Sequence, residues 1–147
     1  MIWEWALRAY GQPGVPEACL RLQDEFGQNT SFLLWAVWAE TADPALLARA
    51  AEVTRAWEAA ALGPLRAVRR ALKPPAPPVP DDAREGLRED VRDAELRAER
   101  VLMETLAGLS ADPRGGTPAL AALEAASAAW SPSAPDGPLA ALAAALG

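Results

Sequence analysis

The sequence predicts an all-α protein: a compact helical bundle of about five core helices, with a proline-rich connector and a loosely ordered Ala/Pro-rich C-terminal tail. Three observations predict this class. Alanine, the strongest helix former, dominates the aliphatic residues. Aromatic residues, which favour strands, are only 6% of the 147 residues. Apolar residues recur at helical spacings of three and four between stretches that contain glycine and proline.

Two helices are expected in the first part of the chain. Residues 2–10 carry apolar side chains three and four positions apart, which predicts a short helix. After the turn "GQPG", a second helix is expected from Gly14 to Gly27, and Gly27 suits the left-handed conformation that often ends a helix. Its apolar stripe consists of Val15, Ala18, Cys19, Leu22 and Phe26.

The next two helices differ in character. Residues 32–40 are apolar on every side, so we expect this helix at the centre of the domain, covered from several directions. Asp43 followed by Pro44 combines a capping carboxylate with a proline at the first helical position, which predicts a helix start. That helix is expected to break or kink at Gly63-Pro64 and to resume as far as Leu72.

A proline-rich segment separates these helices from the longest one. Residues 74–80, "PPAPPVP", predict an extended connector inside the domain. The following helix is expected to start at Asp81 or Asp82 and to run to about Leu109. Its heptad-like apolar seam, which predicts nearly antiparallel packing, consists of Leu87, Val91, Ala94, Ala98, Val101, Thr105 and Gly108.

The C-terminal part of the chain contains only short helix-forming segments. Two short Ala-rich segments, 118–130 and 138–146, predict helices that would be marginal in isolation. We expect residues 131–147 to be mobile. The sequence therefore predicts a single helical domain over residues 1–110, followed by short helices and a flexible tail over residues 111–147.

Charge and composition favour some classes of protein over others. The formal net charge of −6 argues against a nucleic-acid partner. The longest apolar run has eight residues, whereas a membrane span needs about 20, so no membrane insertion is expected. A single cysteine and an N-terminus without a basic, signal-like region favour the cytoplasm. Abundant Ala, Arg, Pro and Gly suggest a GC-rich bacterial genome.

Few residues suit catalysis. The chain has no histidine, which removes histidine-based triads and most zinc sites, and it has no dinucleotide-binding or P-loop motif. We therefore expect no enzyme activity, no cofactor and no metal. Cys19 could in principle act as a nucleophile, but its place on an apolar stripe favours an inert core thiol.

One cluster of cations is a candidate binding site. Four basic residues within eight positions share neighbouring faces of a helix and are called the basic face here: Arg66, Arg69, Arg70 and Lys73. They could bind an anion or an acidic partner. Alternatively, they could pair internally with Glu95 and Glu99 of the longest helix. The sequence leaves both alternatives open.

A second candidate lies near the end of the Gly14–Gly27 helix. Gln23 and Asp24 could be the polar groups of a pocket, which tryptophans of the first 60 residues could line. Alternatively, Gln23 would bond to backbone groups of a loop, Asp24 would be solvated, and the tryptophans would pack in the core.

Three segments carry a family resemblance. The first contains Tyr10, Pro13-Gly14-Val15, Ala18-Cys19-Leu20, Leu22-Gln23-Asp24, Gly27, Leu33-Leu34 and Trp38. The others are "PLRAVRRALK" (Pro64–Lys73) and "AELRAE" (Ala94–Glu99). Together they resemble the proteobacterial domain of unknown function 2390. At residues 27–31 the chain reads Gly-Gln-Asn-Thr-Ser, whereas the family pattern is Gly-x-Asp-Val-Asn. The resemblance implies a small bacterial cytoplasmic protein and supplies no catalytic residue.

Two functions fit these features. The first is a non-enzymatic interaction or accessory protein whose basic face binds a protein partner, with the connector at residues 74–80 holding that face in place. The second is a small-molecule or lipid binder with a tryptophan-lined pocket between helices, anchored by Gln23 or Asp24. Apolar faces of the longest helix could also be buried in a homodimer.

Overall fold

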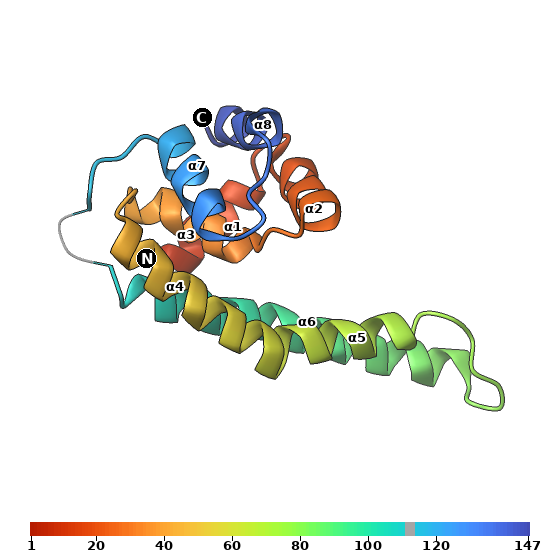
Figure 1. The fold of residues 1–147 in the computed structure, drawn as a ribbon. Helices are drawn as coiled ribbons and strands as arrows, with labels where there is room; N and C mark the ends of the chain where they lie inside the picture. The colour runs from red at the N-terminus through yellow and green to blue at the C-terminus, as the bar shows by residue number, and fades with distance from the viewer. Residues whose placement is uncertain (111–113) are drawn as a thin grey trace. The chain divides into compact units, whose positions relative to one another are not determined.

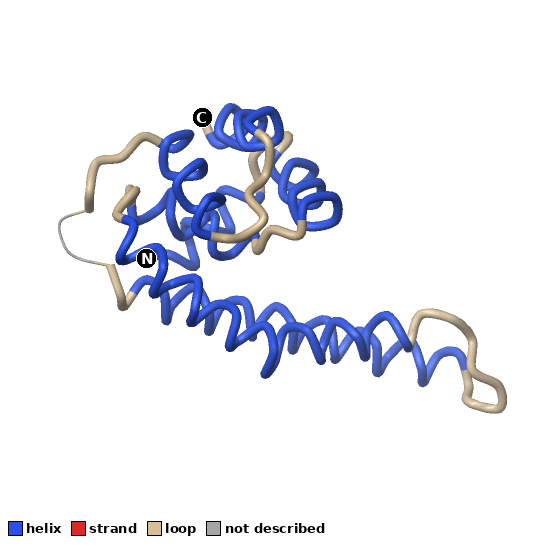
Figure 2. Tube along the Cα trace, viewed as in Figure 1, coloured by secondary structure: helices blue, strands red, loops and turns tan. Residues whose placement is uncertain are grey.

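Helices make up the regular structure of the protein in a computed structural model that describes residues 1–110 and 114–147, and no strand occurs among these residues (Figures 1 and 2). The all-α prediction is confirmed. The elements are α1 (Ile2–Tyr10), α2 (Val15–Phe26), α3 (Thr30–Ala39), α4 (Pro44–Trp57), the π-helix η1 (Glu58–Leu62), α5 (Gly63–Ala71), α6 (Asp81–Ala107), α7 (Ala119–Ala129) and α8 (Asp136–Leu146).

Contacts group the chain into two compact units. The core unit contains Met1–Thr54 and Met103–Gly147, and the hairpin unit contains Arg55–Leu102. Helices α4 and α6 each begin in one unit and end in the other. No local sequence signal marks this grouping, because both helices continue without interruption across the boundary.

Local signals in the sequence explain the entry into the core. Helix α2 lies between Gly14 (φ 87°) and Gly27 (φ 61°), both left-handed, as expected for Gly27. Asn29 caps α3, since its side-chain oxygen accepts a hydrogen bond from the backbone N–H of Phe32 at 2.9 Å. These two features set the direction in which α3 enters the core.

Helix α3 lies at the centre of the core unit, as its uniformly apolar sequence predicts. In Figure 1, α7 runs beside α3 and α8 beside α2, in agreement with their contacts. The ring centre of Phe32 is 5.9 Å from that of Trp35 and 5.7 Å from that of Trp130. The buried residues of α3 are Ser31, Phe32, Leu33, Leu34, Trp35, Ala36 and Ala39.

The C-terminal segment differs from the loosely ordered, mobile tail predicted from the sequence. Residues 136–146 form α8, in which Leu139 and Leu142 are buried, and Leu123 of α7 is fully buried. The side-chain amide of Gln28 donates to the carbonyl oxygen of Pro132 at 2.8 Å. Helices that are marginal in isolation are stable here because α2 and α3 cover their apolar sides.

The hairpin unit consists of the end of α4, η1 and α5 on one limb and most of α6 on the other, side by side in Figure 1. The connector at residues 74–80 joins the limbs and is exposed along its whole length. The π-helix lies where Gly63-Pro64 predicts a break. Proline has no N–H for the helical ladder, and a Cβ on residue 63 would lie 2.8 Å from the carbonyl oxygen of Glu58.

Candidate functional site

Two residues of the basic face are paired inside the hairpin unit. Arg69 forms an ion pair with Glu95, one of the two carboxylates that the sequence suggested. Arg66 pairs with Glu58 at 3.5 Å, a partner that the sequence analysis did not name. All four side chains are no more than 26% exposed, so these pairs are screened less than surface pairs. The Arg69–Glu95 pair joins the two limbs, whereas the Arg66–Glu58 pair lies within the first limb.

The other two residues of the basic face point elsewhere. Arg70 and Lys73 are exposed at the C-terminal end of α5, and neither forms an ion pair with a described residue. The structure therefore separates the basic face into an internally paired half and a solvent-facing half.

Arg84 fixes the end of α5 from the opposite limb. It is 7% exposed, and its Nη1 donates to the carbonyl oxygens of Leu72 and Lys73, each at 2.8 Å. Ion pairs with Asp81 and Glu85 balance its charge. The sequence analysis missed this residue. The available signal was an arginine in the first turn of a helix, where acidic residues are preferred.

Further polar groups lie between the two limbs of the hairpin unit. The indole Nε1 of Trp57 donates to the carbonyl oxygen of Ala98 at 2.9 Å. Burial raises the pKa of the Glu99 carboxyl, and the carboxylates of Glu95 and Glu58 raise it further, whereas nearby arginines lower it. The contact between the limbs thus contains a network of charged side chains, whereas the sequence predicted a heptad-like apolar seam for α6.

Gln23 and Asp24 do not line the pocket of the core unit that is described below. Gln23 is partly exposed, Asp24 is exposed, and neither side chain forms a hydrogen bond with a described residue. The loop after α2 is instead fixed by Gln28, through Pro132, and by Trp130, whose indole Nε1 donates to the carbonyl oxygen of Gly27 at 2.9 Å. The partners lie more than 100 residues away, so no local pattern could reveal them.

Cys19 is buried in the core unit, as the apolar stripe of α2 predicts. Burial raises the pKa of its thiol to about 11, and a hydrogen bond with Tyr10 offsets part of this effect. A thiol with such a high pKa is a poor nucleophile near neutral pH.

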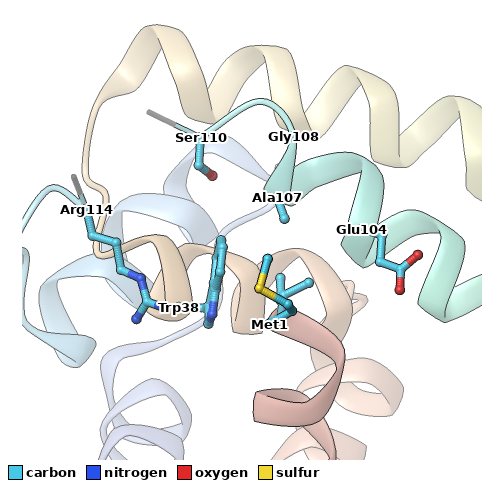
Figure 3. A pocket seen from close by; sticks show the side chains of 8 residues that line it. Met1, Trp38, Glu104, Ala107, Gly108, Ser110 and Arg114 are labelled. Atoms are coloured by element: carbon cyan, nitrogen blue, oxygen red, sulfur yellow. The ribbon is translucent and has the colours of Figure 1, made fainter. Parts of the chain in front are cut away.

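The core unit contains a pocket of about 560 Å³ (Figure 3). Arg114 lies over the ring of Trp38, with 4.6 Å from its guanidinium carbon to the ring centre, and 3.9 Å from the carboxylate of Glu40. The sequence analysis anticipated a tryptophan in a pocket but did not name Arg114, Ser110 or Glu104. The lining residues are Met1, Ile2, Trp38, Glu104, Ala107, Gly108, Ser110 and Arg114.

Comparison with known families agrees with the resemblance seen in the sequence. Residues 1–106 match the model of the family described as "Protein of unknown function (DUF2390)". The chain belongs to this family. No curated protein and no solved structure matches the chain. In this DUF2390 member, α7 and α8 lie beyond the matched residues, yet both contribute to the core unit.

Two further properties of this DUF2390 member concern membranes and metal ions. Among the helices within residues 1–110 and 114–147, none has both the length and the apolar character that a membrane crossing requires. In the same part of the chain, no three Cys, Asp or Glu side chains are placed to hold a metal ion together.

Proposed function

We propose that the protein is a non-enzymatic interaction protein of the bacterial cytoplasm that binds an acidic segment of a protein partner. The binding residues are Arg70 and Lys73. The observation that carries this proposal is the division of the basic face: Arg66 and Arg69 have internal carboxylate partners, whereas Arg70 and Lys73 are exposed. The proposal is narrower than the four-residue face expected from the sequence.

The rigidity of this end of α5 supports the proposal. Arg84 holds the carbonyl groups of Leu72 and Lys73, and the Arg69–Glu95 pair holds the preceding turn. A surface that is already ordered loses little conformational entropy on binding.

The distribution of charge along the chain also supports an acidic partner. Residues 55–102 contain ten basic and nine acidic residues, a net charge of +1, whereas the rest of the chain contains four and eleven, a net charge of −7. The first limb of the hairpin, residues 55–73, has five basic residues and one acidic residue. An acidic partner would therefore be attracted to this limb and repelled elsewhere.

A charge-reversal experiment tests the proposal. The tagged protein is used to capture partners from its host at physiological salt, and chemical cross-links map the contact. We expect the double variant Arg70→Glu/Lys73→Glu to lose a stoichiometric partner that cross-links to α5. The matched control, Arg92→Glu/Arg97→Glu, makes the same change of charge at exposed positions of α6 and should keep the partner.

Salt gives a second readout. Because exposed charges are screened at high ionic strength, the wild-type complex should weaken as salt is raised. Retention of the partner by the Arg70→Glu/Lys73→Glu variant would contradict the proposal, as would a wild-type protein that captures no partner.

A further inference from the structure

We propose that the pocket of the core unit binds a small monocarboxylate with an apolar body, such as a medium-chain fatty acid anion. This activity is separate from the partner binding proposed for α5. Arg114 would bind the carboxylate, and the apolar wall of the pocket would cover the body of the ligand.

The wall of the pocket is suited to an apolar body. It is formed by the side chains of Met1, Ile2 and Ala107, by Gly108, and by the indole of Trp38 (Figure 3). A volume of about 560 Å³ lies within the range of sites that hold small organic molecules. Burial of an alkyl or aryl group against this wall would remove apolar surface of both partners from water.

Arg114 is suited to a carboxylate. It is the one guanidinium among the described residues that line the pocket, and its position over the Trp38 ring orients it. Among the described residues, its nearest carboxylate is that of Glu40, which is 3.9 Å away and too far for a direct hydrogen bond. The guanidinium therefore keeps donors for a two-pronged, charge-assisted contact with a ligand carboxylate.

Ser110, which lines the same pocket as Arg114, provides a second donor. Its Oγ accepts a hydrogen bond from the indole Nε1 of Trp35 at 2.9 Å, which fixes the position of the oxygen. Its own hydroxyl hydrogen has only a long contact, 3.5 Å, with the carbonyl oxygen of Leu106. The hydroxyl can therefore turn toward a carboxylate held by Arg114 and gain a shorter bond.

Glu104 disfavours a second carboxylate in the ligand. In the view of Figure 3, Trp38 and Met1 lie between Arg114 and Glu104, so the lining carries opposite charges on its two sides. A second carboxylate at the far end of a ligand would meet the negative charge of Glu104. Dicarboxylates should therefore bind more weakly than monocarboxylates of the same length.

Calorimetric titration of the full chain with three ten-carbon probes tests the proposal. Decanoate below its micelle concentration should bind with 1:1 stoichiometry, at least tenfold more tightly than decanol or decanedioate. Arg114→Gln should weaken decanoate at least tenfold and leave decanol unchanged. Arg8→Gln removes an exposed arginine of α1 that does not line the pocket, and it should change neither affinity.

A second variant tests the wall independently of charge. Ala107→Leu adds bulk inside the pocket at the end of α6 and should abolish binding of both decanoate and decanol, while the melting temperature shows that the variant is folded. Absence of saturable decanoate binding to the wild type would overturn the proposal. Equal affinity of Arg114→Gln and the wild type, or undiminished binding by Ala107→Leu, would do the same.

Discussion

At the scale of single residues, Glu95 and Glu99 on α6 have opposite effects on stability. Glu95 pairs with Arg69, so Glu95→Gln should destabilise the protein by about 1–3 kcal/mol. Burial raises the pKa of Glu99 above its ordinary value of 4.5, which means that the folded state favours the neutral carboxyl. Glu99→Gln should therefore raise the free energy of unfolding at pH 7.

The pH dependence follows from the sign of this shift. A raised pKa means that the folded state holds the Glu99 proton more tightly than the unfolded state, so stability is lost as pH rises from about 4.5 through the folded-state pKa. The increase in the free energy of unfolding caused by Glu99→Gln should be present at pH 7 and absent at pH 4. Urea unfolding at both pH values measures it. Destabilisation by this variant at pH 7 would contradict the account.

The thiol of Cys19 gives a second prediction at this scale. With a pKa of about 11, roughly one molecule in 1,000 carries a thiolate at pH 8, and the side chain is also buried. A disulfide reagent at pH 8 should therefore label the native protein at least about 100-fold more slowly than the protein unfolded in guanidinium. Similar rates in the two states would show that Cys19 is accessible.

The sequence revealed residues whose role depends on near neighbours. The burial of Cys19 and the left-handed conformation of Gly27 follow from local pattern, and both were predicted. Arg84 and Arg114 were missed because their contacts are set by tertiary structure: Arg84 reaches carbonyl groups of another helix, and Arg114 lies over a ring 76 positions earlier in the chain. Their own surroundings in sequence carry no such information.

At the scale of elements, the geometry of the π-helix predicts that an alanine at residue 63 destabilises the protein. A Cβ at residue 63 would lie 2.8 Å from the carbonyl oxygen of Glu58, and backbone must move to admit it. Gly63→Ala should therefore destabilise the protein by about 1–3 kcal/mol. Gly86 in α6 has open space around its Cβ position, so Gly86→Ala should stabilise by about 0.5–1 kcal/mol. Urea unfolding of both variants measures the contrast, and a neutral or stabilising Gly63→Ala would contradict it.

Element boundaries were predictable where capping chemistry is strong. Pro44 begins α4 and Asp81 begins α6 as expected, and the connector between the limbs occupies the expected residues. The stability of the C-terminal helices was underestimated, because helix propensity and length describe a helix in isolation. Their stability comes from packing against α2 and α3, and a single sequence does not reveal which surfaces meet.

At the scale of the whole molecule, the two units differ in how much apolar surface they bury. The buried residues described in the hairpin unit are Leu62, Arg84, Ala98 and Leu102, whereas the core unit buries most of α3 and parts of six other helices. Local opening costs less where fewer apolar contacts are lost. Backbone amides of residues 86–97 should therefore exchange hydrogen faster than those of residues 31–39, as measured by mass spectrometry of peptides. Equal protection of the two segments would contradict this expectation.

The packing of α7 against α3 has a consequence for the newly made chain. Translation adds about 5–20 residues per second, so α7 is made roughly 5–20 seconds after α3. During this interval the most apolar helix of the protein has no α7 beside it. The nascent chain must therefore be shielded, by transient collapse or by a chaperone, until the last two helices emerge.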